Sequence, residues 1–163
     1  MEPLLLAKII IDHCIEVDNP ATNLQLQKIL YFLQLKSIIE DGFDKRIILE
    51  PCFEAWRFGP VIPVVYNMYR RNGGLKITCS HYPNKKLPDI EIPTYVNNFI
   101  DSALKVKPFK LVALSHNDEG AWKSTYVEGQ KKLIKDELVF QEARIIQDID
   151  KRLGCHLFYN PHI

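Results

Sequence analysis

Apolar residues recur with helical spacing at the start of the chain. Positions 6, 9, 10 and 13 follow the i, i+3, i+4, i+7 pattern. Proline is tolerated in the first turn of a helix, so a helix is expected from Pro3 to about Ile15. The run Asp18-Asn19-Pro20 should then end it, because the residue before a proline disfavours helical geometry.

The next segment carries a stronger helix signal. Thr22 followed three residues later by Gln25 is the pattern of a capping box, in which each side chain bonds a free backbone N–H of the first turn. Apolar residues then occupy an arc much wider than one helical stripe, up to an expected stop at Gly42. A helix this apolar is predicted to lie between other elements.

The period changes after residue 47. Residues 47–58 indicate extended chain, although Pro51 restricts any strand there to an edge. Gly59-Pro60 predicts a sharp turn, and Pro63 can start a helix that ends near Asn72. The alternating segment 75–79 is expected to pair with the segment before Trp56 in a small antiparallel sheet.

The second half of the chain is predicted to be helical. Helices are expected from Pro93 to the proline at 108, over residues 109–115, from Trp122 to before Gly129, and from Asp136 as N-cap to about Leu153. The fold class predicted is therefore mainly α (α+β), with six to seven helices and a small antiparallel β element around residues 47–58 and 75–79. A single domain is expected over residues 1–163.

Composition and net charge limit the classes of function that this chain can have. The 163 residues are 47% hydrophobic and 25% charged, as in an ordinary globular protein. A formal net charge of +1 gives no overall field that would draw the chain onto nucleic acid. Short basic clusters are interpreted as solvated faces, although they leave a nucleic-acid contact open: Arg70-Arg71, Lys85-Lys86, Lys105/Lys107/Lys110 and Lys131-Lys132 with Lys135.

The cysteines and the amino terminus indicate a cytoplasmic protein. Four cysteines are widely spaced and form no C-x-x-C pair, so reduced and buried thiols are expected. The apolar start of the chain lacks the features of a signal peptide, and no run approaches the ~20 apolar residues of a membrane span.

Candidate catalytic groups do not form a recognisable site. Ser115-His116-Asn117-Asp118 contains the residue types of a hydrolase triad, but neighbouring residues project in different directions. His116 is therefore expected to make a structural hydrogen bond that closes the turn before Trp122. The glycines match no phosphate-binding motif, and neither a metal site nor a cofactor is expected. The Lys28 stem is expected to lie along apolar surface, with its ammonium reaching an acid or the solvent.

Three blocks of sequence carry a family resemblance. The chain resembles the Panacea antitoxin domain family of SocA-like antitoxins and phage-associated proteins over roughly Leu6 to Leu153. One departure is Ala121, where such families usually carry proline. The blocks are Thr22-Asn23-Leu24-Gln25-Leu26-Gln27-Lys28-Ile29-Leu30-Tyr31, then Phe53-Glu54-Ala55-Trp56-Arg57-Phe58-Gly59-Pro60-Val61 leading into Val65-Tyr66, then Leu114-Ser115-His116 followed by Trp122-Lys123.

The resemblance implies a helical domain without enzymatic activity that neutralises a cognate toxin by direct binding, or by delivering it to a protease. Two alternatives stay open: a mobile-element regulator that binds nucleic acid, and a hydrolase that uses His116. Interface anchors are expected around the Gly59-Pro60 corner and near Trp122, namely Arg57, Tyr66, Tyr69, Arg70, Lys123 and Tyr126. The family motif, structural or partner-binding, comprises Lys28, Tyr31, Trp56, Arg57, Gly59, Pro60, Tyr66, His116, Trp122 and Lys123.

Overall fold

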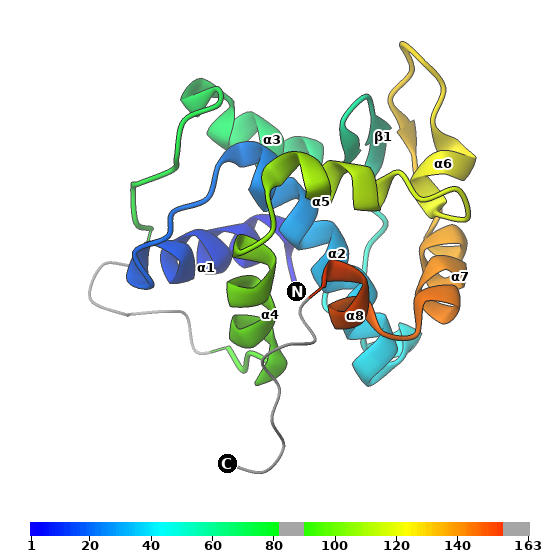
Figure 1. Ribbon diagram of the computed structural model, residues 1–163, viewed down its shortest axis with the longest axis horizontal. Coiled ribbons are helices and arrows are strands. Elements are labelled where there is room, and N and C mark those ends of the chain that lie inside the picture. Colours follow the sequence, from blue (N-terminus) through cyan, green and yellow to red (C-terminus); the bar gives the residue numbers. More distant parts are fainter. Residues whose placement is uncertain (82–89, 155–163) are drawn as a thin grey trace.

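Helix α2 (Asn23–Asp41) lies at the centre of the structure, a computed structural model that describes residues 1–81 and 90–154 (Figure 1). Its amino terminus has the predicted capping box, with Thr22 and Gln25 bonding each other's backbone. Its carboxyl terminus is capped by Gly42 at φ 86°, as expected. Fourteen of its 19 residues are buried, so the helix has almost no solvent face.

The other helices pack around α2. Helix α1 begins at Pro3, where the Glu2 carboxylate accepts hydrogen bonds from the next backbone N–H groups. Contacts with α2 come from α1, α3, α4, α5, α7 and α8. Their bounds are α1 Pro3–Glu16, α3 Pro63–Tyr69, α4 Tyr95–Leu104, α5 Pro108–Ser115, α6 Ala121–Thr125, α7 Asp136–Ile146 and α8 Ile149–Leu153, with 3₁₀ helices η1 Phe43–Lys45 and η2 Arg70–Asn72.

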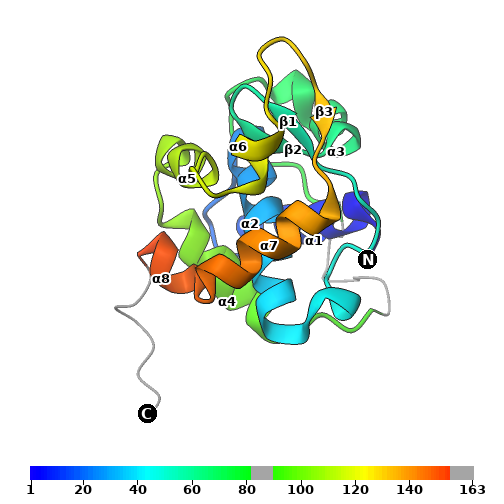
Figure 2. The same ribbon diagram turned by 90° about the vertical axis from the view of Figure 1, so that its right-hand side faces the viewer.

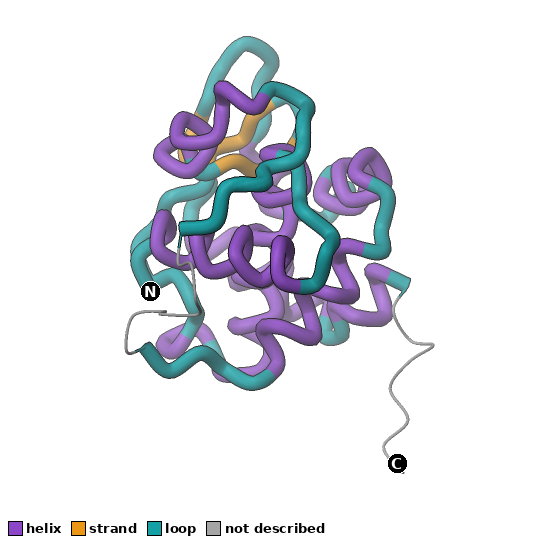
Figure 3. Tube along the Cα trace, turned by 90° about the vertical axis from the view of Figure 1, so that its left-hand side faces the viewer, coloured by secondary structure: helices purple, strands orange, loops and turns teal. Residues whose placement is uncertain are grey.

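A small antiparallel sheet lies at one end of the helical body (Figures 2 and 3). Its order is β2-β1-β3, with β1 at Glu54–Trp56, β2 at Gly59–Val61 and β3 at Lys132–Leu133. Gly59 is paired with Trp56, so the expected Gly-Pro corner begins a strand and the turn itself is Arg57-Phe58. The predicted fold class is confirmed.

The predicted strand partner was wrong. Segment 75–79 forms no named strand, and its pairing is an isolated bridge between Lys76 and Thr22. Strand β1 instead pairs with β3, which comes about 75 residues later and presents only two residues. Alternation over so short a segment carries little information about its partner.

The last helix is also divided, which brings the α-helices of the described residues to eight. Helix α7 ends at Ile146, and its C-cap residue Gln147 takes the left-handed conformation with φ 54°. The Asp148 carboxylate then caps α8 by accepting from the Lys151 N–H at 2.9 Å. An apolar pattern that continues through residues 145, 146, 149 and 153 hid this break.

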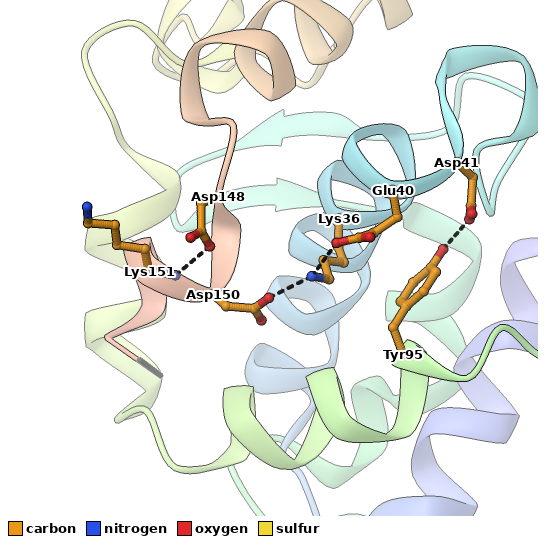
Figure 4. A network of polar contacts seen from close by, with 7 residues as sticks. All are labelled: Lys36, Glu40, Asp41, Tyr95, Asp148, Asp150 and Lys151. Carbon is orange, nitrogen blue, oxygen red and sulfur yellow. Dashed lines mark hydrogen bonds and ion pairs between the residues drawn. The ribbon is translucent and has the colours of Figure 1, made fainter. Parts of the chain in front are cut away.

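Polar contacts join the carboxyl-terminal half of α2 to α8 and α4 (Figure 4). The Lys36 ammonium reaches Asp150 at 2.6 Å and Glu40 at 2.7 Å. The Tyr95 hydroxyl donates to Asp41 at 2.6 Å. These contacts seat the short last helix against α2.

None of the described helices combines the length and the apolarity needed to cross a membrane.

The cysteines behave only in part as predicted. Cys14 is buried, Cys52 is half-buried and Cys79 is exposed, and all three are free thiols. Burial raises the pKa of Cys14 and of Cys52 to about 12, so both stay protonated at neutral pH. The expectation of burial was therefore wrong for Cys79, and Cys155 lies outside the described residues.

Candidate functional site

The Lys28 side chain is completely buried beneath the β1–β2 hairpin. Its Nζ donates to the Pro60 carbonyl oxygen at 2.7 Å. The expectation that its ammonium would reach an acid or the solvent was wrong, since no ion pair to Lys28 is found among residues 1–81 and 90–154. A buried cation opposite a lone carbonyl is costly, so the contact must be fixed by the packing around it.

Burial lowers the pKa of Lys28 from 10.5 to about 7. The physical cause is desolvation, which disfavours the charged form of a group taken out of water. Near neutral pH, protons are therefore divided between the ammonium and the neutral amine. Both forms carry an N–H that can reach the Pro60 oxygen.

Gly59 lets the hairpin approach Lys28 closely. Its φ is +98°, and a Cβ atom there would lie 2.5 Å from the Ser115 Oγ and 2.7 Å from the Lys28 Nζ. Real Cβ atoms do not make such short contacts, so both the conformation and the space require glycine. Ser115 is itself fully buried, and its hydroxyl donates to the Val112 carbonyl at 2.8 Å.

Two amide side chains of α2 bind the chain that follows the β1–β2 hairpin. The Gln27 Oε1 accepts from the Ile62 N–H at 2.9 Å, and its Nε2 donates to the Asn23 Oδ1 at 3.1 Å. Asn23 in turn donates to the Tyr66 carbonyl at 3.1 Å. Sequence reasoning missed both roles. Polar residues four positions apart on an otherwise apolar helix were the available signal.

His116 and Trp122 stack at the side of this cluster. The two rings are parallel within 3°, with centroids 3.6 Å apart. The Tyr126 ring also stacks on Trp122, with centroids 4.6 Å apart. The Trp122 Nε1 donates to the Trp56 carbonyl at 2.7 Å and so joins α6 to β1.

The predicted side-chain hydrogen bond of His116 is not found at Nε2, which has no partner among the described residues. Burial lowers the pKa of His116, and the positive charges of Lys28 and Lys123 lower it further. The imidazole is therefore neutral at pH 7 and contributes mainly through its stacked face.

Glu142 of α7 is buried and contacts the hydroxyl end of Tyr31. Its Oε2 accepts from the Tyr31 hydroxyl and from the Ala121 N–H, at 2.5 and 2.9 Å. Burial raises the pKa of Glu142, while these two hydrogen bonds oppose that shift. Burial, followed by the charge of Glu142, also raises the pKa of Tyr31 well above 10. Sequence reasoning missed Glu142, because nothing in its own helix marks it as buried.

The structure therefore divides nine of the ten residues of the family motif into two groups and leaves the half-buried Trp56 between them. Tyr31 and Trp122 are core residues, and Trp56 is half-buried under the Lys131 ammonium, 3.7 Å from its ring centroid. We call the interior group the hub: Lys28, Tyr31, Gly59, Pro60, His116 and Trp122, together with Ser115 and Glu142. The exposed motif residues are Arg57, Tyr66 and Lys123.

Comparison with known proteins gives this arrangement a family. The protein-family model described as "Antitoxin SocA-like, Panacea domain" matches residues 26–123. The chain belongs to this family. It is also 30% identical to Antitoxin SocA of Caulobacter vibrioides (strain NA1000 / CB15N), over 85% of this chain and 83% of that protein. No solved structure matches the chain.

The matched part of this Panacea domain runs from α2 to α6 and contains the hub except for Glu142. Glu142 lies beyond it, on α7, yet it bonds Tyr31 and Ala121 inside the match. The family resemblance implied a proline at position 121, where this chain has Ala121. Proline has no N–H, so this chain gains a bond to Glu142 that a proline could not make.

Gly59→Ala tests the close approach of the hairpin to α2. We expect a loss of about 3 kcal/mol or more in the free energy of unfolding, because strain at positive φ adds to the clash with Ser115 and Lys28. Gly129→Ala is the matched control, since Gly129 has φ +76° with no atom near its Cβ position. It should lose only about 1 kcal/mol. Equal losses in urea titrations would refute the packing argument.

The buried Lys28 predicts a pH-dependent stability. Between the folded pKa of about 7 and the unfolded pKa of 10.5, the unfolded chain binds more protons, so stability rises with pH. From pH 7 to 8.5, wild type should gain about 1–2 kcal/mol relative to Lys28→Met. Urea titrations of both proteins at the two pH values measure this difference, and parallel behaviour would contradict it.

Ala121→Pro tests the bond to Glu142 without disturbing the helix start. Ala121 is the first residue of α6 and Gly120 is extended, with ψ 157°, so proline fits the backbone. We expect a loss of about 1–3 kcal/mol, because the buried carboxylate loses a donor. The same change in a Glu142→Ala background should cost clearly less. Thermal or urea unfolding of all four proteins completes the cycle.

Proposed function

We propose that this chain is an antitoxin that neutralises a cognate toxin by binding it directly. The observation that carries the proposal is its membership of the SocA-like family together with 30% identity to a protein named Antitoxin SocA over most of both chains. In the masking mode of this proposal, the chain occupies the surface that the toxin needs.

The state of the reactive side chains supports a binding role without catalysis. Lys28 and Ser115 are fully buried, where no substrate reaches them. His116 lies flat on Trp122, and its Nε2 is buried without a hydrogen-bond partner among the described residues. No cluster of three potential metal ligands occurs within the described ranges, 1–81 and 90–154. We therefore propose that the protein acts stoichiometrically.

The rigidity of the hub supports the same role. The hairpin turn Arg57-Phe58 is exposed, but Gly59 and Pro60 behind it are buried against α2. Side chains that are already fixed before binding lose less conformational entropy on association. The hub would thus hold the exposed turn, with Arg57 and Phe58, in a fixed position for contact with a toxin.

Delivery of the toxin to a protease is a second mode that begins with the same complex. In the masking mode, the toxin persists in an inactive complex. In the delivery mode, the toxin disappears from the cell. The two modes can therefore be separated by the amount of toxin that remains.

Co-expression with the protein encoded by the adjacent gene tests the proposal. The adjacent gene product alone should stop growth, and this chain should restore it and co-purify at a fixed molar ratio. An immunoblot of the toxin distinguishes masking, with unchanged toxin, from delivery to a protease. Absence of both rescue and co-purification would refute the antitoxin role, and rescue at a large molar excess of toxin would indicate catalysis.

A further inference from the structure

The near-zero net charge hides a strong separation of charge along the chain. Segments 53–76 and 105–135, which we call the basic end, contain eleven of the 21 Lys and Arg residues and four of the 20 Asp and Glu residues. The rest of the sequence contains ten basic and sixteen acidic residues. The net charge of the whole chain therefore does not show that one end is basic and the rest is acidic.

These segments lie together in space. They form the sheet, α3, α5 and α6, which lie in the upper part of Figures 1 and 2, with α4 and α8 below them. All eleven basic side chains are exposed. One of the four acids, Glu54, is engaged by the Trp56 Nε1 at 2.8 Å. Charges of one sign on one end raise the local potential and steer oppositely charged partners.

Exposed apolar side chains gather at the same end. Among the described residues, eleven large hydrophobic side chains are exposed, and eight of them belong to the basic end. Phe109 is 70% exposed and Phe58 is 50% exposed. Large exposed apolar side chains gathered at one end of a soluble protein are typical of interaction sites. The eight are Phe58, Val64, Tyr66, Met68, Leu75, Phe109, Val127 and Leu133.

Phe58 and Phe109 form the best-defined part of this surface. Their rings meet edge to face, with centroids 6.5 Å apart, and connect the hairpin turn to the start of α5. The Arg57 guanidinium lies 5.6 Å from the Phe58 ring, and Lys107 and Lys110 flank Phe109 in the sequence. Aromatic side chains with arginine are the usual energetic centre of a protein interface, and a charged rim sets the encounter rate.

We propose that the Phe58–Phe109 pair and the surrounding basic side chains are the toxin-binding surface, and that they bind an acidic surface patch with an apolar centre on the toxin. The inference rests on the proposed antitoxin function. A folded protein fits better than nucleic acid, because phosphates would satisfy the lysines and bases could stack on Phe58 and Phe109, but the aliphatic Val64 and Met68 would gain no apolar contacts.

Paired variants test the surface by the affinity for the adjacent gene product, measured by isothermal titration calorimetry. Phe58→Ala with Phe109→Ala, and Lys107→Glu with Lys110→Glu, should each weaken binding by about tenfold or more. The matched controls change exposed residues outside the basic end: Leu49→Ala with Ile145→Ala, and Lys45→Glu with Lys151→Glu. These should bind within about twofold of wild type. Affinity of the wild type should fall as salt rises.

The outcomes separate the two proposals. If wild type does not bind the adjacent gene product, the antitoxin function fails, and this inference fails with it. If wild type binds and the controls lose affinity while the basic-end variants do not, the inference alone is overturned.

Two further measurements on the same proteins can also overturn the inference. Binding of double- or single-stranded DNA oligonucleotides that is lost in the basic-end variants, with toxin affinity unchanged, would assign this surface to nucleic acid. A concentration-dependent mass of wild type alone in light scattering, abolished by Lys107→Glu with Lys110→Glu, would assign it to a second copy of this chain.

Discussion

The contact between the Lys28 ammonium and the Pro60 carbonyl is the constraint on which the hairpin depends. A fully buried cation has few stable positions, and here a single backbone oxygen 2.7 Å away defines one. Gly59 must lack a side chain for the chain to come so near. The Gln27 amide fixes the next segment through the Ile62 N–H. The hairpin is thus positioned from α2 by polar groups, while apolar packing supplies most of the stability.

Local signals in the sequence predicted much of the fold. The Thr22–Gln25 capping box, the stop at Gly42 and the wide apolar arc identified α2 and its central position before any coordinates. These features act within a few residues of each other, so they are visible in one sequence. The pairing of β1 with β3 joins residues nearly 80 positions apart, and its two residues leave no readable alternation.

The candidate site was predictable only where the motif itself marked it. Glu142 looked like one acid of an amphipathic helix, and its burial follows from where α7 lies against Tyr31. Lys28 was expected to find water or an acid because that is what most lysines do. The gathering of basic residues at one end could not be predicted from the sequence either, since segments far apart in the chain meet there. Tertiary placement decided all three.

The separation of the buried hub from the exposed turn has an evolutionary consequence. Substitutions at Arg57, Phe58 or Phe109 alter what the protein presents without touching Lys28, Gly59 or Glu142. One scaffold can therefore acquire new recognition specificities at little risk to its own integrity. Selection can therefore act on the outer side chains while the interior side chains are kept.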